Sequence, residues 1–139
     1  MKNLGSKILN DCVPTTFVEA DNYLGGNTSY EEFKTLTNYQ DEVGTLVDKN
    51  GYENLLSKSF NKSSINTDVL SNPELVSQIK NSGGLISTNM PYNLIRHADN
   101  IRSISYYSNK IVLNLRIGSY RLAGVNNKWW FYFLRGIKK

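Results

Sequence analysis

Apolar residues near the start of the chain recur at i, i+4, i+7 and i+11, at Val13, Phe17, Ala20 and Leu24. Positions with this spacing share one face of a helix, so we expect that face to be buried. Asp11 can cap the first turn, Pro14 suits a first-turn position that needs no helical donor, and Gly25-Gly26 offers a left-handed exit. Thr16 and Glu19 fall outside the apolar face. The pattern predicts a helix that begins near residue 12 and ends near residue 24.

A second helix is predicted to begin with Thr28 or Ser29 as its cap. Glu31 and Glu32 would then lie in the first turn, where the helix dipole favours acidic side chains. Phe33 and Leu36 are expected to face inward. The apolar residues of Val43–Leu56 lie on both sides of a glycine, which indicates one helix broken near residues 49–51 or two short helices.

Two different structures are predicted between residues 60 and 88. Residues 60–72 are polar, and we expect an exposed connection around a short strand at Ile65, serving as a mobile lid or a substrate-specific insertion. The run Asn72-Pro73-Glu74 combines a cap, a first-turn proline and an early acid, so it predicts a helix that stops at Ser82-Gly83-Gly84. Leu85–Thr88 reads as a strand.

The last third of the chain favours antiparallel strands. A long strand is expected to enter at Ile95, and a turn at Tyr107-Ser108-Asn109 leads to the alternating segment 110–117. Further strands are expected over 120–125 and 129–134, the second with both faces buried. Helices followed by strands predict an α+β domain, in which the N-terminal helix and the other helices cover a twisted antiparallel sheet.

Composition narrows the class of protein. The chain has 139 residues, 40% of them hydrophobic, which suits a single domain over residues 1–139. The net charge is +4, and the basic residues are scattered apart from Lys138-Lys139, so we expect no nucleic-acid partner. No apolar segment is long enough for a signal peptide or a membrane span. We therefore expect a soluble chain that is cytoplasmic or exported by a route without a signal peptide.

The chain holds one cysteine, Cys12, and one histidine, His97. A single cysteine excludes an internal disulfide, and two soft ligands are too few for an ordinary structural zinc site. We expect no metal and no organic cofactor. Cys12 lies where the first helix should begin, and there unpaired N–H groups and the helix dipole stabilise a thiolate. The alternative is that Cys12 is a small buried apolar residue.

The run Cys12-x-Pro14-Thr15, followed by Tyr23-Leu24-Gly25, resembles the catalytic helix of papain-like bacteriocin-processing peptidases, the double-glycine leader peptidases and their relatives. Val13 replaces the glycine usual in that family. Ser6 stands where the family carries a glutamine that serves as an oxyanion donor. The resemblance implies a papain-like fold and a cysteine nucleophile, with Ser6 or Asn10 as the candidate oxyanion donor.

The same resemblance implies a role for His97, because the family places its histidine at a strand entry after a helix, a glycine turn and a strand. A Cys–His pair needs a third group that orients the imidazole. Family spacing nominates Asn114, whereas simple hairpin counting places a residue near Ser119 opposite His97. Asp99 is a third candidate, since it lies two residues along the same strand face. The family's Asp-Pro signature is absent.

These residues together predict a cysteine peptidase that cleaves a peptide or isopeptide bond of a peptide or protein substrate. Cys12 would attack the carbonyl, and His97 would act as general base. Two alternatives stay open. One is a papain-fold toxin or effector neutralised by an immunity protein, and the other is a catalytically inactive papain-like domain that binds peptides.

Overall fold

A computed structural model describes residues 12–36, 48–93 and 95–138 of the chain. The described helices are α2 (Cys12–Tyr23), α3 (Tyr30–Leu36), α4 (Lys49–Ser59), α5 (Thr67–Leu70) and α6 (Pro73–Asn81), with the short 3-10 helix η1 (Leu122–Gly124). The strands are β1 (Phe60–Ile65), β2 (Leu85–Tyr92), β3 (Ile95–Asn100), β4 (Ser103–Tyr106), β5 (Ile111–Leu115), β6 (Gly118–Arg121) and β7 (Trp130–Ile137). The predicted cap Asp11 lies outside the described residues.

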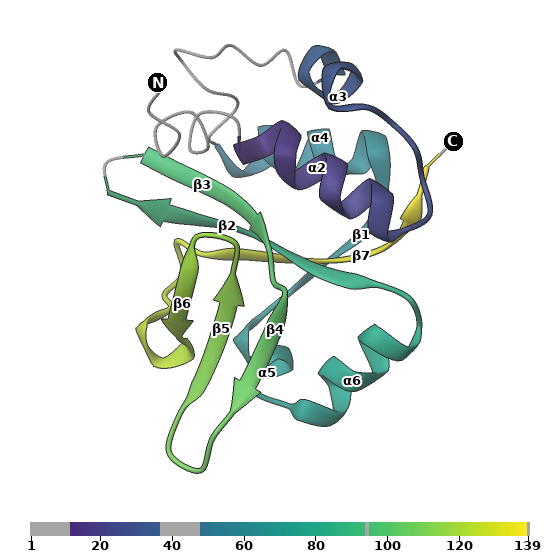
Figure 1. Ribbon diagram of the computed structural model, residues 1–139. Coiled ribbons are helices and arrows are strands. Elements are labelled where there is room, and N and C mark those ends of the chain that lie inside the picture. The colour runs from purple at the N-terminus through teal and green to yellow at the C-terminus, as the bar shows by residue number, and fades with distance from the viewer. Residues whose placement is uncertain (1–11, 37–47, 94, 139) are drawn as a thin grey trace, which may run out of the picture.

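The strands form two antiparallel sheets, which confirms the α+β class. One sheet has four strands in the order β1-β7-β2-β3, and the other has three in the order β4-β5-β6. Figure 1 shows α2, α3 and α4 on one side of the four-stranded sheet, with the three-stranded sheet, α5 and α6 on the other. The expectation of a single sheet is therefore wrong.

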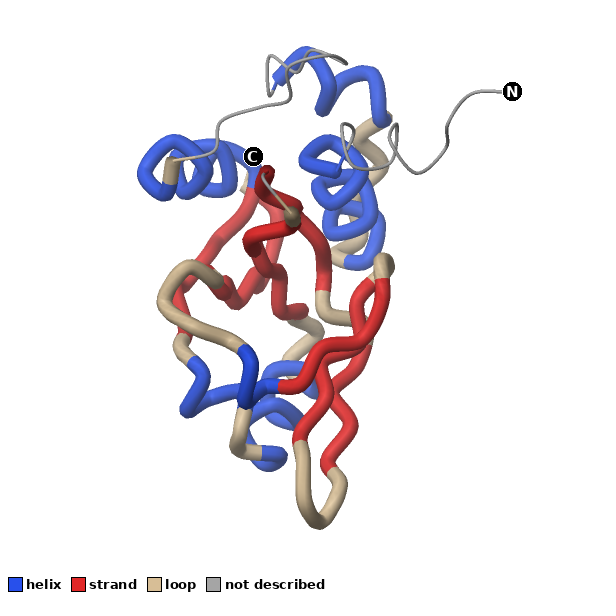
Figure 2. The backbone as a smooth tube through the Cα atoms, turned by 90° about the vertical axis from the view of Figure 1, so that its left-hand side faces the viewer, coloured by secondary structure: helices blue, strands red, loops and turns tan. Residues whose placement is uncertain are grey.

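The two sheets part at a pair of consecutive residues. The N–H of Ile101 donates to the carbonyl of Ile86 at 2.8 Å, in the four-stranded sheet, while the N–H of Arg102 donates to the carbonyl of Asn114 at 2.8 Å, in the three-stranded sheet. The long strand predicted to enter at Ile95 is consequently two strands, β3 and β4. The tube in Figure 2 shows the second sheet extending away from the first.

Both faces of the four-stranded sheet are covered. The face toward α2 and α4 has a core that includes Phe17, Tyr52, Leu56, Tyr132 and Leu134. The opposite face packs against α6 and the three-stranded sheet, in a core that includes Val76, Ile79, Ile86, Leu113 and Phe131. Successive residues of β7 alternate between these two cores, which confirms the strand with two buried faces predicted near residues 129–134.

Local signals place two helices correctly. Along α2, Val13, Phe17 and Ala20 are buried as predicted, and Gly25 ends the helix with φ of 94°. Before α6, the Asn72 side chain accepts hydrogen bonds from the N–H groups of residues 74 and 75, and Gly83 has φ of 84° after its end. These helices form where the sequence carries both a start and a stop.

One local prediction is tested only in part. The break predicted near residues 49–51 coincides with the start of α4, where Asp48 accepts the N–H of Gly51 at 2.7 Å, and residues 43–47 of that prediction lie outside the described residues. Other local predictions are wrong. Leu36 is 41% exposed and does not face inward. Residues 60–72 contain the predicted strand at Ile65, which is the end of β1 and pairs with β7, but the rest of the segment forms α5 rather than a lid. The strand expected over 120–125 is replaced by the end of β6 and by η1.

Candidate active site

Helix α2, which begins with Cys12 and is called the cysteine helix below, covers part of the edge of β3, the strand that carries His97. β3 is an edge strand of the four-stranded sheet. The Sγ of Cys12 accepts a hydrogen bond from the N–H of Ala98 at 3.4 Å, and the Thr16 hydroxyl donates to the carbonyl of Ala98 at 2.9 Å. Both outward backbone groups of Ala98 therefore bond to α2. This contact explains why Thr16, which falls outside the apolar face, is nonetheless buried.

His97 and Asp99 form a buried pair on β3. They are two residues apart and so share one face of the strand. The Nε2 of His97 lies 2.9 Å from Oδ2 of Asp99, and both side chains are fully buried. Because a carboxylate only accepts, Nε2 carries the proton and Nδ1 is the acceptor. Nδ1 is buried and has no hydrogen-bond partner among residues 12–36, 48–93 and 95–138.

The Cys12 sulfur lies at the peptide group that follows His97. Ala98, whose N–H binds the sulfur, directly follows His97 in the chain, so Sγ lies beside the peptide that joins these two residues. Within the described part of the chain, no hydrogen bond joins the Cys12 thiol to the His97 ring. The arrangement supplies a thiol, a ring nitrogen able to accept a proton, and a carboxylate that fixes the ring.

Burial decides the resting state of the thiol. The Cys12 side chain is 5% exposed, and this burial raises the pKa of the thiol. The Ala98 N–H and the Arg116 guanidinium act in the opposite direction, whereas Asp99 raises the pKa further. The expectation that the helix terminus makes Cys12 a ready thiolate is therefore wrong for this resting structure.

Arg116 joins three parts of the site. It follows β5, and its Nη1 lies 2.9 Å from Oε1 of Glu19 on α2 and 3.4 Å from Oδ1 of Asp99 on β3. Its Nη2 donates to the carbonyl of Ala98 at 3.4 Å. The Arg116 side chain is only 15% exposed. Sequence reasoning missed this residue, and its one signal was a charge within the apolar alternation of residues 111–117.

Asn114 does not orient the imidazole. Its Nδ2 donates to the hydroxyls of Ser103 and Ser105, each at 3.0 Å, and its Oδ1 accepts from Ser119 at 2.8 Å. The contact with His97 comes instead from Asp99, which corrects the choice of Asn114 made from family spacing.

Hairpin counting also fails. Ser119 pairs with Asn114, whereas His97 pairs with Met90 of β2. The counting assumed one strand on either side of the turn at residues 107–109, but that turn joins only β4 and β5. The predicted oxyanion donors Ser6 and Asn10 lie outside the described residues.

Comparison of the chain with protein-family models and with curated protein sequences finds no match. Across residues 12–36, 48–93 and 95–138, no group of three or more histidine, cysteine and acidic side chains is placed to hold a metal ion. No helix in these same ranges has the length and apolar character needed to cross a membrane. The site is therefore interpreted from its own geometry.

Proposed function

We propose that this chain is a cysteine peptidase of papain-like arrangement, with Cys12 as nucleophile, His97 as general base and Asp99 as the orienting group. One observation carries the proposal. A buried imidazole is held at Nε2 by a carboxylate, its Nδ1 bonds to no described residue, and the N–H of the next residue binds the only thiol of the chain. A buried polar atom without a partner calls for an explanation, and a catalytic role supplies one here.

The raised pKa of Cys12 shapes the mechanism. Because the resting thiol keeps its proton, Nδ1 of His97 removes that proton as the sulfur attacks the substrate carbonyl. Asp99 stabilises the imidazolium that forms and prevents rotation of the ring. The imidazolium then donates the proton to the leaving amine as the carbon–nitrogen bond breaks. Water, deprotonated by the same ring, hydrolyses the thioester and regenerates the thiol.

The oxyanion formed during attack needs hydrogen-bond donors. Cys12 begins α2, and the first N–H groups of a helix have no partner within the helix. The N–H of Cys12 itself is therefore one candidate donor, with the dipole of the helix favouring the negative charge. Ser6 and Asn10 stay candidates for the second donor.

Arg116 is a positioning residue in this proposal. Its contacts with Glu19 and Ala98 link the cysteine helix to the histidine strand, and its contact with Asp99 supplies a positive charge to a fully buried carboxylate. An unpaired buried carboxylate would be costly. Arg116 thus fixes both the spacing of the two elements and the charge that holds the imidazole.

A defined peptide library analysed by mass spectrometry tests the proposed activity. We expect the wild-type chain to cleave one set of peptides and the Cys12→Ala variant to cleave none. A peptide chloromethyl ketone should label wild type once, at Cys12, and His97→Ala much more slowly. Cleavage that persists in Cys12→Ala would refute the thiol mechanism.

A second candidate function is peptide binding without turnover, in an inactive domain of the same arrangement. The observation that favours it is the buried thiol with its raised pKa. The two candidates separate in the labelling experiment. A folded wild-type chain whose Cys12 resists the chloromethyl ketone, and which cleaves no library peptide, would be the binding domain.

A further inference from the structure

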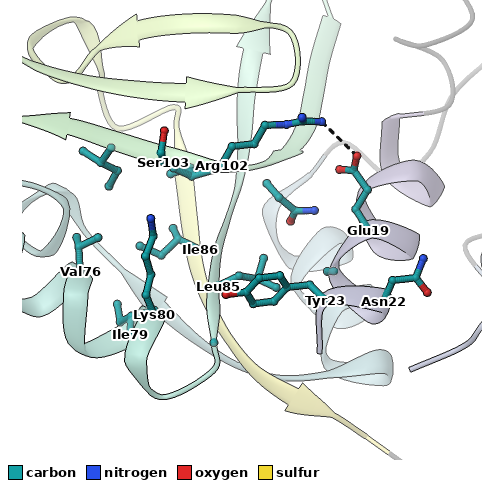
Figure 3. Close-up of a pocket in the computed structure, with 15 residues that line it drawn as sticks. Glu19, Asn22, Tyr23, Val76, Ile79, Lys80, Leu85, Ile86, Arg102 and Ser103 are labelled. Atoms are coloured by element: carbon teal, nitrogen blue, oxygen red, sulfur yellow. Dashed lines mark hydrogen bonds and ion pairs between the residues drawn. The ribbon is translucent and has the colours of Figure 1, made fainter. Parts of the chain in front are cut away.

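A groove lies at the other end of the cysteine helix. It is about 560 Å³ in volume and lies between the last turns of α2, the helix α6 and the start of β2. Figure 3 shows α6 and α2 on opposite sides, with the Tyr23 ring between Leu85 and Asn22. Volumes of this size are typical of pockets that hold small ligands. Apolar side chains dominate its wall, among them Ala20, Val76, Ile79, Leu85, Ile101 and Ile104.

One polar atom in this apolar wall has no partner. Asn100 lines the groove with a side chain that is 9% exposed, and its Oδ1 is buried without a hydrogen bond to any residue that the structure describes. Its orientation is fixed, because Nδ2 donates to the carbonyl of Thr16 at 3.0 Å. A flipped amide would place two oxygens against each other. The wall of the groove therefore contains an unsatisfied acceptor, which would pair with a ligand N–H that displaces the atoms now covering it.

The rim of the groove carries an excess of positive charge. Arg102 pairs across one end with Glu19, at 3.4 Å between Nη2 and Oε2. Figure 3 shows Lys80 extending from α6 along the groove. Lys80 is exposed, and among the described residues it has no ion-pair partner. An anionic group of a ligand would therefore find a free ammonium at this rim.

These three features identify the chemistry of the occupant. We propose that the groove binds the C-terminal end of a short apolar peptide. Its apolar side chains would pack on the wall, a backbone N–H would donate to Oδ1 of Asn100, and its terminal carboxylate would pair with Lys80. A fatty acid matches the apolar wall and the charge but has no donor for Asn100.

The groove lies farther along α2 than Cys12, and Glu19, which pairs with Arg116, lines it. Ala20 lies eight residues along α2 from Cys12, which at 1.5 Å per residue is about 12 Å. The inference does not depend on cleavage. Its test uses the Cys12→Ala variant, so that a catalytic failure and a failure of the groove are told apart.

The probe is acetyl-Ile-Leu with a free carboxylate, titrated into ¹⁵N-labelled Cys12→Ala protein and followed by backbone amide shifts. We expect the largest shifts at Ile79, Leu85 and Ile101. The C-terminal amide of the same probe should bind about fivefold more weakly, as should the free acid to a Lys80→Met variant. Methylation of both backbone nitrogens of the probe, which removes its two N–H groups, should weaken binding about tenfold, because Asn100 stays unpaired.

Two controls sharpen the result. Lys58→Met removes a lysine from the last turn of α4 and should leave binding unchanged. Decanoate should bind more weakly than the peptide. Decanoate binding as tight as the peptide, equal binding of the amide, shifts centred on Ala98, or no binding at millimolar probe would each overturn the proposal.

Discussion

The junction of α2 with β3 and the sheet β4–β5–β6 each contain a network of polar side chains, and only the first is proposed here as a reactive site. In the three-stranded sheet, Asn114 satisfies both ends of its amide with serine hydroxyls, and the network holds no titratable group. At the junction, a fully buried histidine and carboxylate lie beside a thiol, and one ring nitrogen has no partner. A hydrogen-bond network alone does not identify a candidate site. A buried pair of ionisable side chains with one unpaired polar atom does.

We expect the largest effect on activity from the two residues considered for the orienting role, Asp99 at the junction and Asn114 in the three-stranded sheet. Asp99→Asn should lower kcat/KM for a library-identified peptide about 10³-fold, because a carboxamide can donate to Nε2 and so favour the tautomer with the proton on Nδ1. The single imidazole allows ¹⁵N NMR to assign the tautomer directly. Asn114→Ala is the matched control, and we expect its activity to stay within about twofold of wild type. A reversed ranking of the two variants would return the orienting role to Asn114.

The next largest effect is expected from Arg116→Met, measured as the loss in the free energy of unfolding in urea. Loss of the guanidinium leaves the buried Asp99 without its positive partner, which we expect to cost about 3 kcal/mol. Arg102→Met is the control, because Arg102 binds the same Glu19 but is 57% exposed, and it should cost less than about 1 kcal/mol. Equal losses in the two variants would mean that Arg116 contributes only a surface ion pair.

His97→Ala should slow the alkylation of Cys12 by iodoacetamide about tenfold at neutral pH, because the buried thiol then has no base to take its proton. The single cysteine makes the modified mass unambiguous. Wild-type protein in denaturant gives the rate of the exposed thiol. If His97→Ala reacts as fast as folded wild type, the ring does not serve the thiol.

The smallest effect concerns alkaline stability. The raised pKa of Cys12 means that the unfolded thiol ionises before the folded one, so wild-type stability falls as pH rises above the unfolded pKa near 8.5. The loss should approach about 1 kcal/mol over the first pH unit above that value. Cys12→Ala should lack this loss. Burial also raises the pKa values of Tyr52 and Tyr132, and Cys12 adds to the rise at Tyr52, so the two proteins are compared below the unfolded tyrosine pKa near 10. Parallel urea stabilities from pH 8 to 10 would contradict the raised pKa.

The sequence predicted those parts of the molecule whose signals are local. The cap at Asn72, the glycine after each of two helices and the spacing of Val13, Phe17 and Ala20 act within a few residues, and both helices formed where expected. The contact between Asp99 and His97 could also be predicted from the local sequence, because residues two apart on a strand share one face. Asp99 ranked below Asn114 only because family spacing was preferred to strand geometry.

The rest of the site depends on contacts that no local pattern carries. A run such as residues 95–106 looks like one strand, and only the divergent bonds of Ile101 and Arg102 divide it between two sheets. Arg116 reaches Glu19 across 97 positions of the chain. The buried state of the Cys12 thiol follows from the whole fold around it. A helix N-terminus in the sequence says nothing of how much water reaches it.

The seal between α2 and Ala98 has a consequence for the behaviour of the protein in solution. An uncovered edge strand offers a row of N–H and carbonyl groups to which another chain can add and start aggregation. Cys12 and Thr16 occupy both outward groups of Ala98, at the middle of such an edge. The Cys12 sulfur therefore also protects the edge of β3. A bulky adduct on this thiol would uncover β3, so modified protein should self-associate as well as lose the proposed activity.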